Sequence, residues 1–165
     1  MPEVRDSKKL SPTKREHILI DARAREVSGG LFARTILTDA HTLDTDGLSL
    51  CLYRSIEEGI VELLEFVGVN PKSVFVLLDG SLKAPPQYKQ QTIIKGDDKI
   101  FSIALASVYA KVTRDQVMEQ YDIRYPKYNF FQHKGYGTVE HMKNIKKFGL
   151  SPIHRRSFLT KYIKV

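Results

Sequence analysis

Residues 74–80 read Val-Phe-Val-Leu-Leu-Asp-Gly, and this stretch decides the fold class. An unbroken run of five apolar residues is typical of a strand that is covered on both faces, as in the sheets of α/β proteins. Asp79 should then stand at the carboxyl end of this strand, where ligand sites form in open α/β sheets. The alternative is that Asp79 only caps a turn, because Asp-Gly is a common turn pair. The pattern leaves both interpretations open.

The residues around this strand predict four helices and two further short strands. Ser11, Asp46 and Thr138 are the expected N-caps, and Gly68 and Gly149 are the expected ends of two helices. The predicted helices cover about 12–27, 47–67, 100–121 and 139–148, and the predicted strands cover 31–38 and 92–94. This order of elements indicates one α/β domain.

Length and composition restrict the class of protein. A chain of 165 residues points to one domain, and its 42% hydrophobic residues suffice for a core. The single cysteine, Cys51, excludes an intrachain disulfide and a cysteine-rich zinc site. No apolar run reaches the roughly 18–20 residues of a membrane span, and the charged residues 1–9 do not fit a signal peptide. We therefore expect a cytoplasmic protein with no membrane partner.

Positive charge is concentrated at the C-terminal end of the sequence. Residues 133–165 contain eight Lys or Arg residues and one acidic residue, so they account for the whole formal net charge of +7. Aromatic residues are interleaved with these charges: Tyr136, Phe148, Phe158 and Tyr162. This pattern favours a surface for a polyanion over a tail that only increases solubility.

Asp115 is the second candidate for chemistry. On the predicted helix it shares a mostly small and apolar face with Val108 and Val112, so it extends a buried face. A carboxylate in such a place needs a partner, such as a metal ion or a base. Arg114 offers a plain ion pair, but adjacent residues on a helix point about 100° apart, so we do not expect this pair to meet easily.

Two carboxylates beside a basic surface fit phosphodiester hydrolysis on two divalent cations. Oxygen ligands hold such cations roughly 4 Å apart, so that one activates the attacking water and the other stabilises the leaving oxygen. Two aspartates are too few for this arrangement, so at least one further acidic residue is required. Asp97 and Asp98 are better explained as acids that interact with the N-terminal dipole of the long helix.

Residues 6–11, Asp-Ser-Lys-Lys-Leu-Ser, place positive charge and hydroxyl groups just before a predicted helix. The N–H groups at a helix N-terminus favour anions. Ser7, Lys8 and Lys9 are therefore candidate phosphate contacts. A solvated chain terminus has the same composition, so this segment is weak evidence by itself.

Residues 133–138, His-Lys-Gly-Tyr-Gly-Thr, place flexible glycines around a lysine and a tyrosine. Tyr136 is suited to stacking on a base or to hydrogen-bonding a ribose hydroxyl, and packing against the core is the alternative. His41, His141 and His154 are scattered along the sequence, and we interpret them as structural or surface residues.

Taken together and in this order, seven segments of the sequence resemble ribonuclease HII. They span nearly the whole chain with the spacing of that family. Each segment alone is weak evidence, whereas the ordered set is highly specific. The segments are 6–11 (DSKKLS), 77–80 (LLDG), 94–97 (IKGD), 102–115 (SIALASVYAKVTRD), 125–128 (YPKY), 133–138 (HKGYGT) and 152–158 (PIHRRSF).

The resemblance implies a ribonuclease H-like α/β fold, in which helices flank a mixed sheet, with a C-terminal helical extension. It implies an endonuclease that uses Mn²⁺ or Mg²⁺ to cleave the RNA strand of RNA–DNA hybrids and ribonucleotides embedded in duplex DNA. Asp79 and Asp115 match two of the four acidic residues that are catalytic and bind metal in the family. A complete chain is expected to be a monomer. The substrate contacts implied are Ser7, Lys8, Lys9, His133, Lys134, Tyr136 as the ribose-sensing tyrosine, Arg155 and Arg156.

The sequence departs from the family pattern at its start. In the family, an opening strand with an Asp-Glu pair and then Gly-Arg-Gly precede the Asp-Ser-Lys segment, and no such motif occurs in these 165 residues. We therefore expect one domain, 1–165, with an N-terminally truncated α/β core over about 1–122 and a basic helical extension over about 123–165. Such a core lacks two metal ligands, and its uncovered strand edge invites association or misfolding.

Three hypotheses follow from this departure. We favour an incomplete ribonuclease HII, from a misplaced start or a fragment, with impaired cleavage. The second is a catalytically inactive module that binds hybrid or other nucleic acid, completed by a partner that supplies a strand. The third is a poorly folded gene remnant. An in-frame Asp-Glu-x-Gly-Arg-Gly motif upstream would favour the first, and a stop codon close to Met1 would favour the others.

Overall fold

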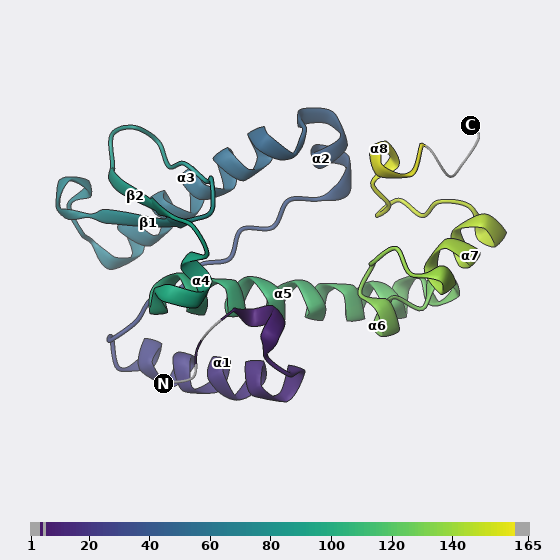
Figure 1. The fold of residues 1–165 in the computed structure, drawn as a ribbon, viewed down its shortest axis with the longest axis horizontal. Helices are drawn as coiled ribbons and strands as arrows, with labels where there is room; N and C mark the ends of the chain where they lie inside the picture. The colour runs from purple at the N-terminus through teal and green to yellow at the C-terminus, as the bar shows by residue number, and fades with distance from the viewer. Residues whose placement is uncertain (1–3, 5, 161–165) are drawn as a thin grey trace. The chain divides into compact units, whose positions relative to one another are not determined.

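The computed structural model of the chain describes Val4 and residues 6–160. It has a mixed α/β structure: helices precede and follow a small sheet along the sequence (Figure 1). The predicted α/β class is confirmed. The chain divides into two compact units, Met1–Leu37 with Leu52–Val112, and Thr38–Cys51 with Thr113–Val165. The long helix α5, Phe101–Arg124, contributes its first half to the first unit and its second half to the second.

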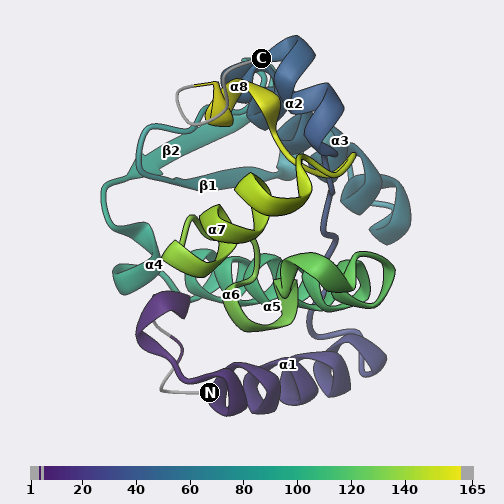
Figure 2. The ribbon, with the colours of Figure 1, turned by 90° about the vertical axis from the view of Figure 1, so that its right-hand side faces the viewer.

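The sheet of the first unit consists, in the described residues, of two parallel strands. β1 (Phe75–Asp79) pairs with β2 (Lys89–Ile93) over their full length, and the two lie side by side in Figures 1 and 2. Both strands were predicted, although β2 starts three residues earlier than expected. The prediction that β1 is covered on both faces is wrong here, because Phe75 is 56% exposed and Leu78 is the one buried residue of the strand. A sheet of two strands leaves much of each strand in contact with solvent.

Helix α1 (Pro12–Val27) forms as the sequence predicts. Ser11 is its N-cap, and the Ser11 hydroxyl accepts a hydrogen bond from the N–H of Lys14 at 3.3 Å. Pro12 occupies the first helical position, where its missing N–H costs nothing. The helix packs against the first half of α5, as Figures 1 and 2 show, and the shared core contains Leu19, Ala22, Ala104, Leu105, Val108 and Val112.

The predicted strand over residues 31–38 is wrong, because this segment pairs with no strand in the described part of the chain. The segment packs instead against helix α3, Leu48–Val67. The rings of Phe32 and Phe66 meet edge to face with centroids 5.7 Å apart, and the Arg34 guanidinium lies 4.0 Å above the Phe66 ring. Apolar and β-branched residues favour extended backbone whether their surface is buried by a sheet or by a helix.

Asp46 does not stand directly before the second helix, as the sequence predicts it should. It is the last residue of a short helix, α2 (Ala40–Asp46), and α3 begins two residues later. The N-cap of α2, which was not predicted, is Asp39, whose carboxylate accepts a hydrogen bond from the N–H of Thr42 at 2.8 Å. That hydrogen bond lowers the pKa of Asp39.

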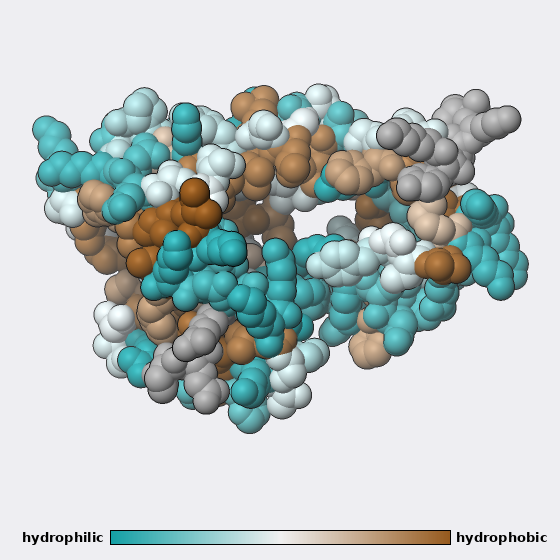
Figure 3. Space-filling view, in the orientation of Figure 1, coloured by the Kyte–Doolittle hydropathy of each residue, from teal (hydrophilic) through white to brown (hydrophobic). Residues whose placement is uncertain are grey.

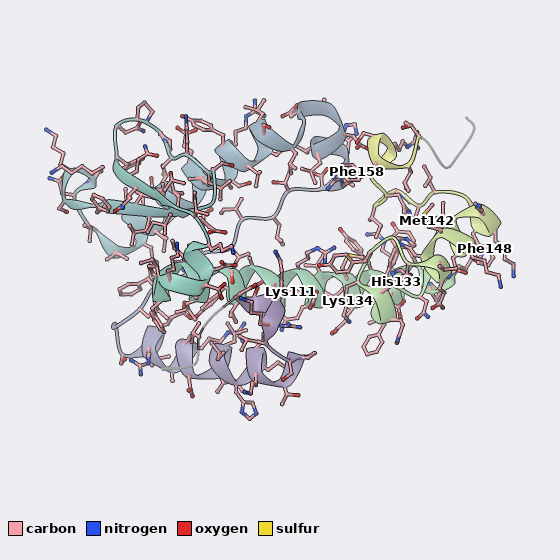
Figure 4. The ribbon with its side chains drawn as sticks, viewed as in Figure 1. Lys111, His133, Lys134, Met142, Phe148 and Phe158 are labelled. Atoms are coloured by element: carbon pink, nitrogen blue, oxygen red, sulfur yellow. The ribbon has the colours of Figure 1, made fainter. Side chains whose placement is uncertain are left out.

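The second unit is built from the end of α5 and a series of short helices. Its core is formed by Tyr128, Phe130 and Ile145. Helix α7 (Val139–Phe148) is the helix predicted over 139–148, with the Thr138 hydroxyl accepting from the N–H of His141 at 3.2 Å. Figure 4 labels Met142 and Phe148 on this helix.

The remaining short elements of the chain are η1 (Ser7–Lys9), η2 (Pro71–Ser73), α4 (Gly96–Lys99), η3 (Pro126–Tyr128), α6 (Phe130–His133) and α8 (Arg156–Leu159).

Over Val4 and residues 6–160, no helix is both long enough and apolar enough to span a bilayer.

Candidate functional site

Asp79 ends β1, and its side chain is fixed by a backbone group. Asp79 Oδ1 accepts a hydrogen bond of 2.7 Å from the N–H of Gly96, the first residue of α4. Gly96 is buried, and a Cβ atom there would lie 2.7 Å from Ile103 Cδ1 and 3.2 Å from Asp79 Oδ1. Only glycine therefore lets α4 approach the carboxylate this closely.

The backbone after Asp79 also makes the turn that the Asp-Gly pair predicts. Gly80 has a positive φ of 63°, and its N–H donates to the Ile93 carbonyl at 3.0 Å. The N–H of Leu82 donates to the Asp79 carbonyl at 3.2 Å. The turn uses the backbone of Asp79, whereas its carboxylate points to Gly96. The two interpretations of this residue are therefore compatible.

The candidate phosphate segment 7–9 lies in the first unit and is engaged with α4. Lys9 Nζ lies 2.8 and 2.7 Å from the two carboxylate oxygens of Asp98. This contact lowers the pKa of Asp98 and raises the pKa of Lys9. Ser7 is buried, and its carbonyl accepts a hydrogen bond from Arg15, whereas Lys8 is exposed. Asp98 is thus the ion-pair partner of Lys9, in addition to being an acid near a helix N-terminus.

Asp115 lies in the second half of α5, and its side chain is 17% exposed. Its neighbour Arg114 approaches after all, since Arg114 Nη1 lies 3.8 Å from Asp115 Oδ1. The two side chains therefore meet, contrary to the expectation, because the flexible arginine side chain can bend toward the adjacent residue. The contact is at the outer limit of an ion pair, and the hydrogen bond of Arg114 goes elsewhere.

Arg114 connects α5 to the predicted nucleic-acid segment 133–138, of which residues 134–138 form the loop after α6. Its Nη2 donates to the Lys134 carbonyl at 3.0 Å, and its guanidinium lies 4.8 Å from the centre of the Tyr136 ring. Lys134 and Gly135 have φ angles of 46° and 78°, which turn the chain sharply after α6. Tyr136 is 56% exposed, so its ring is available at the surface. The loop is therefore anchored beside Asp115 within one unit.

Lys134 has a separate ion pair in the same region. Its Nζ lies 2.7 Å from Glu119 Oε1 on α5 and 4.2 Å from the centre of the Phe131 ring. Figure 4 shows Lys134 next to His133 at the end of α6, and it also shows Lys111 on α5. A phosphate bound by Lys134 would have to compete with Glu119 for its charge.

The basic C-terminal residues fall into two groups. On α7, Lys143, Lys146 and Lys147 are exposed, and hydrophilic surface dominates the outer end of this helix in Figure 3. Arg155 lies 3.6 Å above the ring of Phe158, which Figure 4 labels on α8. Residues 161–165, with two further lysines and Tyr162, lie outside the described residues. The exposed lysines of α7 are the clearest cationic surface of the second unit.

Arg156 begins α8, and a distant acidic side chain, which was not predicted, caps this helix start. Asp44 of α2 accepts hydrogen bonds from the backbone N–H groups of Arg156 and Ser157 at 2.6 and 3.2 Å. Burial alone would raise the pKa of Asp44, but the hydrogen bonds from Ser157 and Arg156 outweigh it and lower the pKa. This long-range cap has no signal in the sequence, because 112 residues separate Asp44 from Arg156.

The interpretation of His41, His141 and His154 as structural or surface residues is confirmed, but it did not foresee that two of them meet in one cluster. His141 and His154 are buried in one cluster, with their Nε2 atoms 3.0 Å apart, and His133 stacks on His141. His41 is exposed on α2. His133, a predicted substrate contact, is itself 6% exposed. No periodicity in the sequence brings these residues together, because a loop and a helix separate them.

The two candidate carboxylates belong to different units, Asp79 to the first and Asp115 to the second. That Asp79 and Asp115 bind one metal ion together remains a prediction. In the described parts of the chain, no three His, Cys, Asp or Glu side chains form a group that could hold a metal ion. Two carboxylates do fit Mg²⁺ or Mn²⁺ in their chemistry, because such ions are commonly held by one or two carboxylates together with water and substrate phosphates.

Comparison with known proteins assigns the chain to a family. Residues 2–161 match the family model described as ribonuclease HII. The chain belongs to the ribonuclease HII family. Similar proteins named ribonuclease HII include those of Ruminiclostridium cellulolyticum, 38% identical over 98% of this chain, and Syntrophus aciditrophicus, 38% identical over 99%. That of Caldanaerobacter subterraneus subsp. tengcongensis is 37% identical over 99% of this chain.

The match covers a different share of each ribonuclease HII relative. The chain spans 59% of the Ruminiclostridium protein, 64% of the Caldanaerobacter protein and 72% of the Syntrophus protein. The family assignment confirms the resemblance that the ordered motifs indicated.

Proposed function

We propose that this chain contributes to an endonuclease that hydrolyses the RNA strand of RNA–DNA hybrids and ribonucleotides embedded in duplex DNA. The observation that carries the proposal is the place of Asp79. Its carboxylate stands at the carboxyl end of a parallel strand, held by the N–H of Gly96, in a chain that belongs to the ribonuclease HII family. Ligand sites of α/β sheets form at such strand ends.

In this proposal Asp79 and Asp115 are catalytic residues that hold Mn²⁺ or Mg²⁺. A bound divalent cation would lower the pKa of a water molecule and stabilise the charge that develops on the phosphate. Gly96 orients the Asp79 carboxylate through its N–H, and the long contact with Arg114 keeps a positive charge near Asp115. The half-buried position of Asp115, whose side chain is 17% exposed, limits its solvation, which strengthens its attraction to a cation.

The substrate contacts of the proposal lie on both units. Tyr136 offers an exposed ring beside a guanidinium, which suits a ribose or base contact. The segment 7–9 contributes Lys8 and, once it leaves Asp98, Lys9. Contacts with the phosphate backbone are proposed for Ser7, Lys134, Arg155 and Arg156. His133 would support the loop beside them, because its ring nitrogens are bonded to the Tyr128 carbonyl and the Gly135 N–H.

Several properties of the whole protein belong to the same proposal. We place it in the cytoplasm as a monomer of one domain, with the α/β core over about 1–122 and the basic extension over about 123–165. The 165 residues by themselves should cleave weakly. They supply two of the four acidic positions that the family resemblance implies, and two carboxylates hold a pair of cations poorly.

The test is cleavage of an RNA–DNA hybrid with Mn²⁺. The 165-residue chain is compared with a chimera that joins a family segment containing Asp-Glu-x-Gly-Arg-Gly before Asp6. We expect little cleavage by the chain alone and strong cleavage by the chimera. Asp79→Asn or Asp115→Asn in the chimera should lower the rate about a hundredfold or more, whereas Asp21→Asn on the exposed face of α1 should not. Full activity of the Asp79→Asn chimera would refute the assignment.

A second candidate function is nucleic-acid binding without cleavage. The exposed lysines of α7 favour it, because Lys143, Lys146 and Lys147 form a cationic helix surface that needs no metal. A chimera that binds the hybrid with salt-sensitive affinity and does not cleave it in Mn²⁺ or Mg²⁺ would support this candidate over the nuclease.

A further inference from the structure

Three histidines of the second unit form a buried cluster. His133 ends α6, His141 lies on α7 and His154 precedes α8. They are 6%, 5% and 7% exposed, and all six of their ring nitrogens have a hydrogen-bonding partner. The ring centroids of His133 and His141 are 4.2 Å apart. Because every ring nitrogen of the cluster has a partner, the three rings support the surrounding structure and leave no nitrogen to bind a ligand.

The hydrogen-bond partners of His154 Nδ1 and His141 Nδ1 determine which ring nitrogens carry protons. His154 Nδ1 accepts from the backbone N–H and the hydroxyl of Ser151, at 2.9 and 2.7 Å, so neutral His154 carries its proton on Nε2. That N–H donates to His141 Nε2 at 3.0 Å, which leaves the proton of His141 on Nδ1. His141 Nδ1 in turn donates to the Tyr136 carbonyl at 2.9 Å. A single line of hydrogen bonds therefore runs from Ser151 to Tyr136.

This histidine relay, Ser151–His154–His141–Tyr136, ends on the loop 134–138. The Tyr136 carbonyl also accepts the N–H of Thr138 at 2.8 Å, and Thr138 caps α7. His133 completes the support, since its Nδ1 accepts from the N–H of Gly135 at 3.2 Å. The backbone of the loop is thus held from the core, while the Tyr136 ring remains exposed.

The relay requires neutral rings. A second proton on His141 would set two N–H groups against each other across the 3.0 Å contact with His154. A second proton on His154 would face the N–H of Ser151. Burial lowers the pKa of His141, and burial together with the nearby His141 lowers the pKa of His154 to about 4. Both rings are therefore neutral near pH 7.

Several polar and charged groups on neighbouring elements are engaged with other partners. The Tyr128 hydroxyl, whose ring lies 5.0 Å from His154, donates to the Gly149 carbonyl at 3.0 Å. None of these groups offers a carboxylate to a protonated ring. The charged groups and their partners are Lys134 with Glu119, Glu140 with Asn129, Arg155 with Phe158, and Arg114 with Lys134 and Tyr136.

We propose that His141 and His154 are positioning residues that hold the loop 134–138 in the shape that binds nucleic acid, and that protonation of the relay releases this loop. The inference rests on the proposed function, because it takes the loop as a nucleic-acid contact. Plain electrostatics gives the opposite sign, since added positive charge strengthens binding to phosphate. The relay instead makes binding weaker as the histidines become charged.

The first test needs no nucleic acid. Two-bond ¹⁵N–¹H NMR of the histidine rings at about pH 7 should show the Nε2–H form of His154 and the Nδ1–H form of His141. On acidification, the amide signals of Gly135 and Gly137 should move with the same midpoint as His141. An Nε2–H form of His141, or glycine signals that do not follow its titration, would overturn the loop-holding role.

The second test is binding of a labelled RNA–DNA hybrid between about pH 7.5 and pH 4, at constant ionic strength. The natural chain should lose about fivefold or more in affinity, and His17→Asn on α1 should behave identically. His141→Asn keeps a donor for Tyr136 without a titratable ring, so it should bind within about twofold at pH 7.5 and lose most of the pH dependence. His141→Phe removes the donor and should bind about fivefold more weakly at pH 7.5.

The outcomes separate this inference from the proposed function. Affinity that rises steadily toward acid pH in the natural chain contradicts the relay's role. Unchanged binding by a folded His141→Phe variant does the same, and the asparagine variant decides the question if the phenylalanine variant does not fold. A chain with the predicted tautomers and loop release that binds no hybrid at any pH contradicts the proposed function, while the loop-holding role stands.

Discussion

Asp79 Oδ1 accepts a 2.7 Å hydrogen bond from the backbone N–H of Gly96. This bond ties the end of β1 to the start of α4, which packs closely on Ile103 of α5. The orientation of the proposed metal-binding carboxylate therefore depends on a residue without a side chain. The LLDG and IKGD segments, 14 residues apart, meet at this contact.

Replacement of Gly96 by alanine should destabilise the first unit. The new Cβ would lie 2.7 Å from Ile103 Cδ1 and 3.2 Å from Asp79 Oδ1, so either the helix or the carboxylate must shift. We expect a loss of about 1–3 kcal/mol in the free energy of unfolding, measured by urea titration. Gly59→Ala in helix α3 is the matched control, because its new Cβ would meet Ile36 Cγ1 at an ordinary contact distance of 3.5 Å. It should stabilise by about 0.5–1 kcal/mol. Equal effects of the two substitutions would contradict the close approach at Gly96.

Stability should fall as the pH is lowered from about 6.5 toward 4. The pKa of His154 is about 4 in the folded chain, because of burial and the nearby His141, against about 6.5 when unfolded. Between these pH values the unfolded chain binds more protons than the folded chain, so acid favours unfolding. The stability that depends on neutral His154 is therefore fully present above about pH 6.5. The shift corresponds to about 3 kcal/mol.

Urea unfolding at a series of pH values measures this dependence. His154→Asn keeps an acceptor for Ser151 but has no ring to titrate, so its stability should change much less across the same window. His17→Asn, at an exposed site of α1, should keep the natural slope. A natural chain that is equally stable at pH 6.5 and pH 4.5 would contradict the buried neutral histidine.

Charge reversal on α7 should weaken duplex binding and its salt dependence. Lys143→Glu, Lys146→Glu and Lys147→Glu together remove three exposed cations from one helix. We expect about a tenfold or greater loss of affinity at about 0.1 M salt, and a slope of log affinity against log salt that is shallower by about 2–3. The control reverses three exposed lysines of the first unit, Lys72, Lys83 and Lys89. Similar losses from both triple variants would show that binding follows net charge alone and would contradict the α7 assignment.

Local signals predicted much of the fold. Ser11, Pro12 and Thr138 mark helix starts that the structure confirms, because a cap hydroxyl and its target N–H are only three residues apart. The apolar run before Asp79 predicted β1 for the same reason, since strand formation follows from a short contiguous pattern. The position of Asp79 at the strand end then followed directly.

The errors came where distant residues decide the outcome. Residues 31–38 have a strand-like pattern but bury Phe32 against Phe66 of α3, and a single sequence does not show which partner will be used. The Asp44 cap of α8 and the His141–His154 contact join residues 112 and 13 positions apart. The motif order identified the family and the candidate carboxylates, whereas the histidine relay became visible only from the packing.

The most direct test of the central claim is a double-mutant cycle on Mn²⁺ binding, measured by titration calorimetry on the 165-residue chain. If Asp79 and Asp115 hold one cation together, Asp79→Asn and Asp115→Asn should each weaken Mn²⁺ binding by about tenfold or more, and the double variant should be little worse than either single one. Asp21→Asn should leave the affinity unchanged. Independent, additive losses, or Mn²⁺ binding unaffected by either substitution, would contradict a cation shared by these two carboxylates.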